Sequence, residues 1–205
     1  MLPTFAYFKS LFHHLLNHSY KLDGVVDHGV SYALYVKDPD QNGLEFYVDQ
    51  DPLLWPKKDG QIIMYTKALD EKIKHELTHN VKPYIRPNDA IIGHIHLSVC
   101  NLLESKRLFS DIIGFNDIYH GMHLALFLGD HNYHHHIGIN TWGDCDIPFS
   151  NDDLGLLSYH IHIPKKDIPT LIKNLNENDF TFHETPYDIK IHDKLGQIII
   201  IDKPS

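Results

Sequence analysis

The chain has 205 residues, of which 42% are hydrophobic and 22% charged, so it can bury a core and has the composition of a globular protein. The net charge of -9, with histidines counted as neutral, argues against a nucleic-acid partner, because such surfaces draw most of their affinity from Lys and Arg. No apolar run approaches the roughly 18 to 20 residues of a membrane span, so we expect no membrane partner.

The cysteines and the N-terminal segment indicate a location. Cys100 and Cys145 are too few for a disulfide framework and are typical of a reducing compartment. The N-terminal segment has neither a positively charged start nor a small-residue cleavage site, so it predicts no export signal. We therefore expect a cytoplasmic protein.

The first ninety residues predict one helix, several strands and a connector, from hydrophobic spacing and turn residues. In chain order we expect a helix over 5–16, extended segments at 25–30 and 32–36, a turn at 38–43, a strand at 44–48 and a connector over 51–90 with a short helical candidate at 66–77. Alternation along the strand at 44–48 places Glu45 and Tyr47 on the same face.

From residue 92 onward the chain repeats one pattern, which is strand, helix and three strands. The first copy comprises 92–99, a helix over 102–113 closed by Gly114, and strands at 116–119, 123–128 and 134–140. The second copy comprises 157–164, a helix over 167–178, and strands at 180–183, 188–192 and 197–201.

The start of the chain fits the same pattern in part. Pro3 precedes the first helix at a distance similar to that between Pro164 and its helix, so we expect the chain to begin in the last residues of a strand. An unpaired sheet edge would remain there, which predicts a homo-oligomer. The expected domains are a truncated module over 1–53, a connector over 54–90, a middle module over 91–147 and a last module over 155–205.

The strand at 92–99 has two chemically different faces. Side chains alternate along a strand, so Ile95 and Leu97 lie on an apolar face while His94, His96 and Ser98 share a polar face. The chain holds 18 histidines, and histidine is the commonest metal ligand, so two imidazoles on one face suggest a binding site. For any single histidine, the alternative is a hydrogen-bonding role in a wet sheet face.

A repeated unit with His in an opening strand and Glu in a closing strand resembles the vicinal oxygen chelate superfamily of glyoxalases, bleomycin resistance proteins and extradiol dioxygenases. Four segments are similar to its four-module catechol-2,3-dioxygenase-like branch. They are DHGVS at 27–31, ALYVKDPDQNGLEF at 33–46, IGHIHLSV at 92–99 and YHHHIGINTW at 133–142. The resemblance implies an α+β fold of βαβββ modules, two complete and one N-terminally truncated, forming cupped mixed β-sheets with helices outside.

The resemblance also implies a metal site. In that family two modules cup a divalent metal held by two histidines and one carboxylate, with positions left open for a catecholate and dioxygen. By position, Glu45 would be the carboxylate ligand and His94 one imidazole ligand. The second family histidine would precede Met1, which leaves His96 or a histidine of 134–136 as candidates for the third ligand. Fe(II) is the expected ion, with Mn(II) or another divalent metal as the alternative.

Several further histidines have expected roles. In extradiol enzymes a histidine of the closing strand acts as an acid-base group, so the resemblance makes His135 or His136 the catalytic candidate; alternation leaves both open, and a polar strand end is the alternative. The expected substrate contacts are His28, Tyr47 and His96. His160 and His162 look like His94 and His96 but have no evident carboxylate partner in the sequence, so we interpret them as structural.

The expected function follows from the same resemblance. It is an Fe(II)-dependent extradiol-type ring-cleaving dioxygenase, either active or an incomplete or impaired version, that acts on a small aromatic diol with dioxygen in aromatic catabolism. The alternatives are a non-catalytic small-molecule binding protein of the same fold and a glyoxalase-like metal lyase. Arg86 and Arg107 are the only arginines, which favours an aromatic substrate over a thiol conjugate or a phosphonate.

Overall fold

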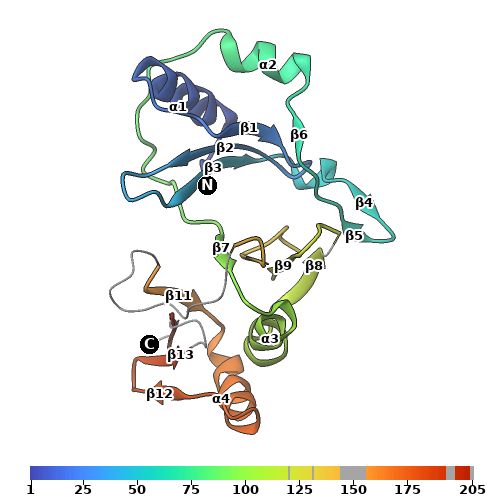
Figure 1. Ribbon diagram of the computed structural model, residues 1–205, viewed down its shortest axis with the longest axis vertical. Coiled ribbons are helices and arrows are strands. Elements are labelled where there is room, and N and C mark those ends of the chain that lie inside the picture. Colours follow the sequence, from blue (N-terminus) through green and yellow to red (C-terminus); the bar gives the residue numbers. More distant parts are fainter. Residues whose placement is uncertain (120, 131, 144–155, 193–196, 204–205) are drawn as a thin grey trace.

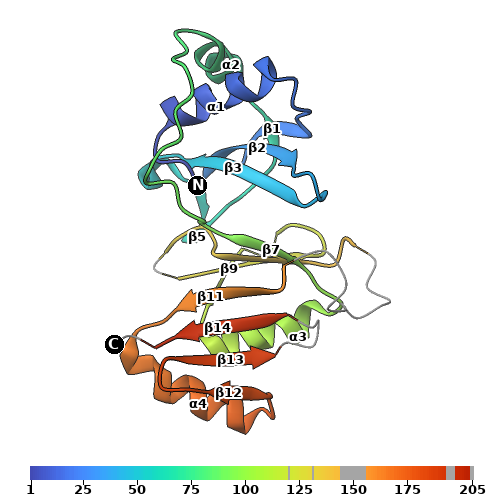
Figure 2. The ribbon, with the colours of Figure 1, turned by 90° about the vertical axis from the view of Figure 1, so that its left-hand side faces the viewer.

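The computed structural model describes residues 1–119, 121–130, 132–143, 156–192 and 197–203 (Figure 1). In this part of the chain, three four-stranded sheets succeed one another along the long axis of the molecule, each formed by neighbouring stretches of sequence (Figure 2). Residues 144–155, between the expected middle and last modules, lie outside the described residues.

The first module contains a helix and a meander of three strands. Its elements are α1 (Phe5–Asn17), β1 (Gly24–Asp27), β2 (Ser31–Lys37) and β3 (Gly43–Asp49). The strand order is β3-β2-β1-β6, where β6 (Lys67–Ala68) comes from the expected connector and pairs with β1. Helix α1 covers one side of this sheet (Figure 1).

The connector is more structured than its composition indicates. Besides β6 it contains η1 (Pro52–Leu54), β4 (Lys57–Lys58), β5 (Gln61–Ile62) and α2 (Glu71–Thr78). Helix α2 begins five residues later than the expected 66, because the Asp70 side chain accepts a hydrogen bond from the backbone N–H of Ile73 and caps the helix there. The domain boundaries named above stay predictions.

The middle and last modules both have the order strand, helix and three strands. The middle module has β7 (Ile95–Ser98), α3 (Leu102–Lys106) continued by the π-helical turn η2 (Arg107–Ile113), β8 (Asn116–Tyr119), β9 (Ala125–Gly129) and β10 (Ile137–Asn140). The last has β11 (Ser158–His162), η3 (Lys165–Asp167), α4 (Ile168–Glu177), β12 (Phe182–Glu184), β13 (Asp188–His192) and β14 (Ile198–Asp202). The expected α+β fold with two complete βαβββ modules is therefore confirmed.

The sheet order brings the first and last strands of each complete module together. The orders are β7-β10-β9-β8 and β11-β14-β13-β12, with β7 parallel to β10 and β11 parallel to β14. Side chains from an opening strand and its closing strand therefore share one sheet face at short range. This topology decides which distant residues can form a site.

Three clusters of buried apolar side chains form the cores of the modules and the contact between them. One runs continuously through the middle and last modules, beneath η2 and α4, and another lies beneath α1. The third joins the connector to the middle module, because Trp55, Ile62 and Met64 pack with Ala125 and Phe127 of β9. This third cluster brings the first and middle modules together.

Two differences from expectation affect the site. The expected strands at 92–99 and 134–140 shorten to β7 and β10, so His94 and the three histidines at 134–136 precede regular pairing. The helix expected at 102–113 becomes π-helical from Arg107 onward. It still ends at Gly114, whose φ of 104° lies in the left-handed region that glycine adopts readily at the end of a helix.

Two findings bear on the expected location. No helix in the described part of the chain is both long and apolar enough to cross a membrane. Cys100 is disulfide-bonded, which does not support the expected reducing compartment, while Cys145 lies outside the described residues.

Candidate metal centre

Glu45 and His94 meet between the first and middle modules. Their side chains are only 13% and 4% exposed, and His94 Nε2 lies 2.9 Å from Glu45 Oε2. Because the carboxylate can only accept, His94 donates from Nε2. The two residues that the family resemblance implied as ligands are therefore in direct contact, although 49 residues separate them in the chain.

Glu45 is surrounded by histidines. His96 Nε2 lies 3.7 Å from Oε2, and His28 Nε2 lies 3.8 Å from Oε1. Burial acts to raise the pKa of Glu45, but the hydrogen bond from His94 and the nearby imidazoles lower it to about 2. Glu45 is therefore a carboxylate at neutral pH, which can accept hydrogen bonds or bind a cation.

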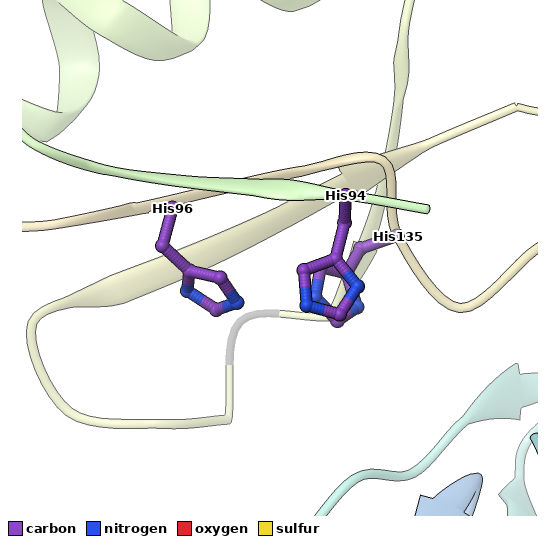
Figure 3. Close-up of side chains that lie close together, drawn as sticks. All are labelled: His94, His96 and His135. Carbon is purple, nitrogen blue, oxygen red and sulfur yellow. The ribbon is translucent and has the colours of Figure 1, made fainter. Parts of the chain in front are cut away.

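His96 contributes a second ring from β7. The rings of His94 and His96 are 5.0 Å apart between centroids and extend to the same side of β7 (Figure 3), which confirms the shared polar face. Gly138 of β10 is paired with His96, and a Cβ at Gly138 would lie 2.7 Å from His96 Nδ1. The missing side chain at Gly138 therefore makes room for the imidazole.

His135 joins the cluster from the segment before β10. Its ring lies 4.1 Å from the ring of His94 and 5.4 Å from that of His96, between centroids (Figure 3). One ring nitrogen each of His94, His96 and His135 lies within 4.8 Å of the others, so the three could hold a metal ion. This is the one such group of three or more potential ligands among the described residues.

A chain of hydrogen bonds determines which nitrogen of His135 carries its proton. His134 Nε2 lies 2.9 Å from Asp49 Oδ1, and His134 Nδ1 lies 2.8 Å from His135 Nδ1. Burial lowers the pKa of His134 despite Asp49, so its ring is neutral with one proton, which it donates to Asp49. His134 Nδ1 must then accept from His135 Nδ1, which leaves a lone pair on His135 Nε2.

That lone pair has no hydrogen-bond partner. His135 Nε2 and His94 Nδ1 are buried nitrogens without a hydrogen bond. Buried polar atoms rarely stay unsatisfied, and a neutral imidazole nitrogen with its other nitrogen held by a second residue is the usual form of a metal-binding histidine. The donor atoms present therefore fit a divalent metal ion.

Tyr47 holds His94 in place. Its ring stacks on that of His94, with 4.6 Å between centroids and 21° between planes. Its hydroxyl lies 3.0 Å from that of Tyr133, which in turn donates to Asp49 Oδ2 at 2.9 Å. Burial raises the pKa of Tyr47, so the hydroxyl stays protonated. Tyr47 is buried as a support for His94, and the expected substrate contact stays a prediction.

His28 reaches the same region from the turn between β1 and β2. Its Nδ1 lies 2.8 Å from the Tyr65 carbonyl oxygen, to which it donates. Its Nε2 lies 2.7 Å from the Tyr35 hydroxyl and 3.8 Å from Glu45 Oε1. The structure thus brings His28 close to Glu45, and its role in substrate binding stays a prediction.

His136 lies elsewhere. Its Nδ1 accepts a hydrogen bond from the backbone N–H of Asp130 at 3.3 Å, and its ring packs near Phe115. His134 and His135 lie in irregular backbone before β10, whereas the backbone of His136 is already hydrogen-bonded to Leu128 of β9 and Ile95 of β7. Of the two catalytic candidates, the structure brings His135 into the cluster.

The sequence reasoning did not identify Asp49 or Tyr133 as parts of the site, and it named His134 only as one candidate for the third ligand. Asp49 continues the alternation of Glu45 and Tyr47 on β3, so this signal was available from the strand pattern. Tyr133 carried no such signal, because its position depends on irregular backbone before β10.

The metal-free protein should lose stability as the pH falls from 6.5 towards 4. Burial of the ring and the charge of His94 lower the pKa of His96 to about 4, although Glu45 opposes the shift. In this range the unfolded chain binds a proton at His96 that the folded chain does not, so folding weakens as pH falls. His96→Gln removes this proton, so its urea midpoint should fall less steeply between pH 7 and pH 4.5.

His183→Gln serves as the matched control, because His183 is an exposed histidine of β12 in the last module. It should follow the wild-type pH dependence. Parallel curves for His96→Gln and the wild type would show that His96 does not bind its proton differently in the folded and unfolded chains.

The comparisons with known proteins identify one sequence relative. Over 175 residues the chain is 35% identical to a Bacillus subtilis (strain 168) protein named catechol-2,3-dioxygenase, covering 83% of this chain and 61% of that protein. The chain thus spans about three fifths of the length of this relative. No family model matches the sequence.

Similar solved structures have lower identity. A glyoxalase/dioxygenase from Nostoc punctiforme is 14% identical, with a TM-score of 0.48 over 62% of this chain and 100% of its own. A putative glyoxalase from Bacillus halodurans is 16% identical, with a TM-score of 0.46 over 57% of this chain and 97% of its own. The fosfomycin resistance protein FosX from Listeria monocytogenes is 14% identical, with a TM-score of 0.43 over 57% and 92%.

The βαβββ modules seen in the structure and the relative named catechol-2,3-dioxygenase agree with the resemblance drawn from the motifs. The resemblance drawn from the motifs is therefore confirmed: the chain is similar in sequence to a protein named catechol-2,3-dioxygenase, and it is built from repeated βαβββ modules.

Proposed function

We propose that this chain carries the metal centre of an Fe(II)-dependent extradiol-type dioxygenase that cleaves a small aromatic diol with dioxygen. The observation that carries the proposal is the contact of Glu45 with His94, 2.9 Å apart, with His96 Nε2 3.7 Å from the same carboxylate oxygen. Two histidines and one carboxylate on one side of an ion are the ligand set of non-haem Fe(II) oxygenases. The sequence relative supports the same activity.

In this proposal Glu45, His94 and His96 are the ligands. Ligand atoms about 2.0 to 2.2 Å from a shared ion stand roughly 3 Å apart, so small movements of His96 would complete the set. Bound Fe(II) would supply the redox chemistry between the diol and dioxygen. Mn(II) has similar preferences for oxygen and nitrogen ligands and is the alternative ion.

His135 is the proposed acid-base group. Its Nε2 carries a lone pair because its Nδ1 is held by His134, and burial lowers the pKa of His135 well below its usual value. A neutral imidazole beside the ion can accept a proton from the hydroxyl of a bound diol and return it later. His28 and Tyr35 lie across Glu45 and are the proposed substrate contacts.

Loss of Glu45 should abolish both metal binding and activity. Glu45→Gln removes the single carboxylate that contacts both His94 and His96. We expect the iron content after reconstitution to fall at least tenfold, and oxygen uptake with catechol to fall to background. Glu177→Gln, a change of an exposed carboxylate on α4, is the matched control and should retain both. A wild-type chain without iron above the control buffer, or an active Glu45→Gln variant, would contradict the proposal.

A second candidate function rests on the three-histidine cluster. His94, His96 and His135 together could hold a zinc-class ion without Glu45, which suits a glyoxalase-like metal lyase. Here His135 would be a ligand rather than an acid-base group. The two candidates therefore differ in what His135 does.

His135→Gln separates the two candidates. With His135 as the acid-base group, the variant should keep its iron while ring cleavage falls about 100-fold or more, the usual contribution of such a group. With His135 as a ligand, the metal content itself should fall. The two readouts are metal per chain and the rate of ring-cleavage product formation. His136→Gln, whose ring faces Asp130, is the matched control.

Asp49 should act as a positioning residue through His134. Removing such an outer partner costs roughly 10- to 100-fold in metal affinity or activity. Asp49→Ala should therefore lower kcat and shift its pH profile, because His134 no longer fixes the proton of His135. Asp49→Asn keeps an acceptor oxygen and should recover most of the loss. Equal defects in both variants would instead indicate a merely structural role.

The remaining predictions concern the protein as a whole. If the chain binds metal but shows no oxygen uptake with any diol tried, it is a non-catalytic binding protein of the same fold. A homo-oligomer and a cytoplasmic location stay predictions, and light scattering tests the first of them.

A further inference from the structure

Gly93 occupies a position where no side chain fits. It immediately precedes His94, in the segment that leads into β7. A Cβ at Gly93 would lie 1.8 Å from the hydroxyl oxygen of Tyr47 and 2.9 Å from its Cζ, and real Cβ atoms essentially never approach another atom within 3.0 Å. A side chain at position 93 and the present position of the Tyr47 ring therefore exclude each other.

Backbone conformation does not explain the glycine. Gly93 lacks the positive φ that favours glycine over other residues, whereas Gly29, Gly60 and Gly114 have it. The residue could therefore be alanine without backbone strain if Tyr47 were not there. Space for the Tyr47 side chain is the reason that the structure gives for a glycine at this position.

Tyr47 has little freedom to give way. The residue is only 2% exposed, and protein interiors are close-packed. Its hydroxyl lies 3.0 Å from the Tyr133 hydroxyl, which donates to Asp49. Its ring stacks on His94. A shift that made room for a Cβ at position 93 would therefore disturb the hydrogen bond, the stack or both.

The contacts of its side chain determine where His94 points. His94 precedes the paired residues of β7, so the sheet does not fix it directly. Its Nε2 donates to Glu45 at 2.9 Å, and its ring lies 4.6 Å from the ring of Tyr47 and 4.1 Å from that of His135, between centroids. Removing the Tyr47 ring from this arrangement would leave the imidazole freer to turn.

We propose that Gly93 is a positioning residue of the candidate metal centre, because it leaves the space from which Tyr47 holds His94. This inference rests on the proposed metal-binding role of His94. Gly93 acts through Tyr47 rather than by contact with a ligand. Its counterpart is Gly138, which leaves room for the ring of His96, so each of the two histidines has a glycine that makes its arrangement possible.

A double-mutant cycle on the metal-free protein tests the proposal. Gly93→Ala should displace Tyr47 and weaken Co²⁺ binding roughly tenfold or more, the usual cost of losing a group that orients a ligand. Tyr47→Phe removes the oxygen that lies 1.8 Å from the added Cβ but keeps the ring that stacks on His94. The double variant should therefore bind Co²⁺ more tightly than Gly93→Ala and unfold at a higher urea concentration.

Two further variants define the measurement. The Co²⁺ site of interest is the one that Glu45→Gln removes, as judged by isothermal titration. Gly43→Ala is the matched control, because Gly43 begins the strand that carries Tyr47, has no positive φ and has nothing within 4 Å of an added Cβ. It should keep the wild-type Co²⁺ affinity and urea midpoint, with or without Tyr47→Phe.

The double variant separates a positioning role from a merely local one. Recovery of Co²⁺ affinity relative to Gly93→Ala supports the proposal. Losses from Gly93→Ala and Tyr47→Phe that simply multiply overturn it, and so does wild-type affinity in Gly93→Ala. If Gly93→Ala does not fold, a folded double variant supports the proposal and an unfolded one overturns it.

Failure of the proposed function would look different. In that case the wild type would have no Co²⁺ site that Glu45→Gln removes. The urea midpoints of the same metal-free proteins then decide whether Gly93 makes room for Tyr47, because recovery in the double variant supports this arrangement and additive losses overturn it.

Discussion

The contact between Glu45 and His94 is the constraint on which the rest of the site depends. A buried carboxylate is costly unless charge and hydrogen bonds compensate for the water it has lost. Here the compensation comes from the middle module, because His94 and His96 approach a carboxylate that belongs to the first module. The two modules must therefore keep their relative position, and the cluster around Trp55 and Phe127 packs them together.

One face of β3 forms most of this junction. Glu45, Tyr47 and Asp49 alternate along the strand, and each contacts the middle module. Glu45 contacts His94 and His96 directly. Asp49 acts indirectly, because it accepts a hydrogen bond from His134, and His134 in turn determines which nitrogen of His135 carries its proton. Between them Tyr47 stacks on His94. A single strand face thus provides both a candidate ligand and the residues that orient the others.

The sequence predicted regular elements better than irregular ones. Strand alternation correctly paired Glu45 with Tyr47 and His94 with His96, because side chains of a strand can only alternate. The same rule could not choose between His135 and His136, because His134 and His135 lie in irregular backbone before β10, where no strand pairing imposes a period. The partner of His160 and His162 was also missed, since the parallel register that brings Asp202 to His162 depends on how two distant strands pair.

The parallel pairing of opening and closing strands has the same geometry in both complete modules, but its chemical result differs. In the middle module the closing strand places Gly138 against His96, which leaves space that a carboxylate from another module can approach. In the last module the closing strand places Asp202 beside His160 and His162, so these ion pairs lie within one sheet and are exposed. A buried cluster between modules is shielded from water, whereas exposed ion pairs within one sheet contribute little to stability. The residue opposite the opening-strand histidines therefore determines whether they approach a carboxylate of another module or one of their own sheet.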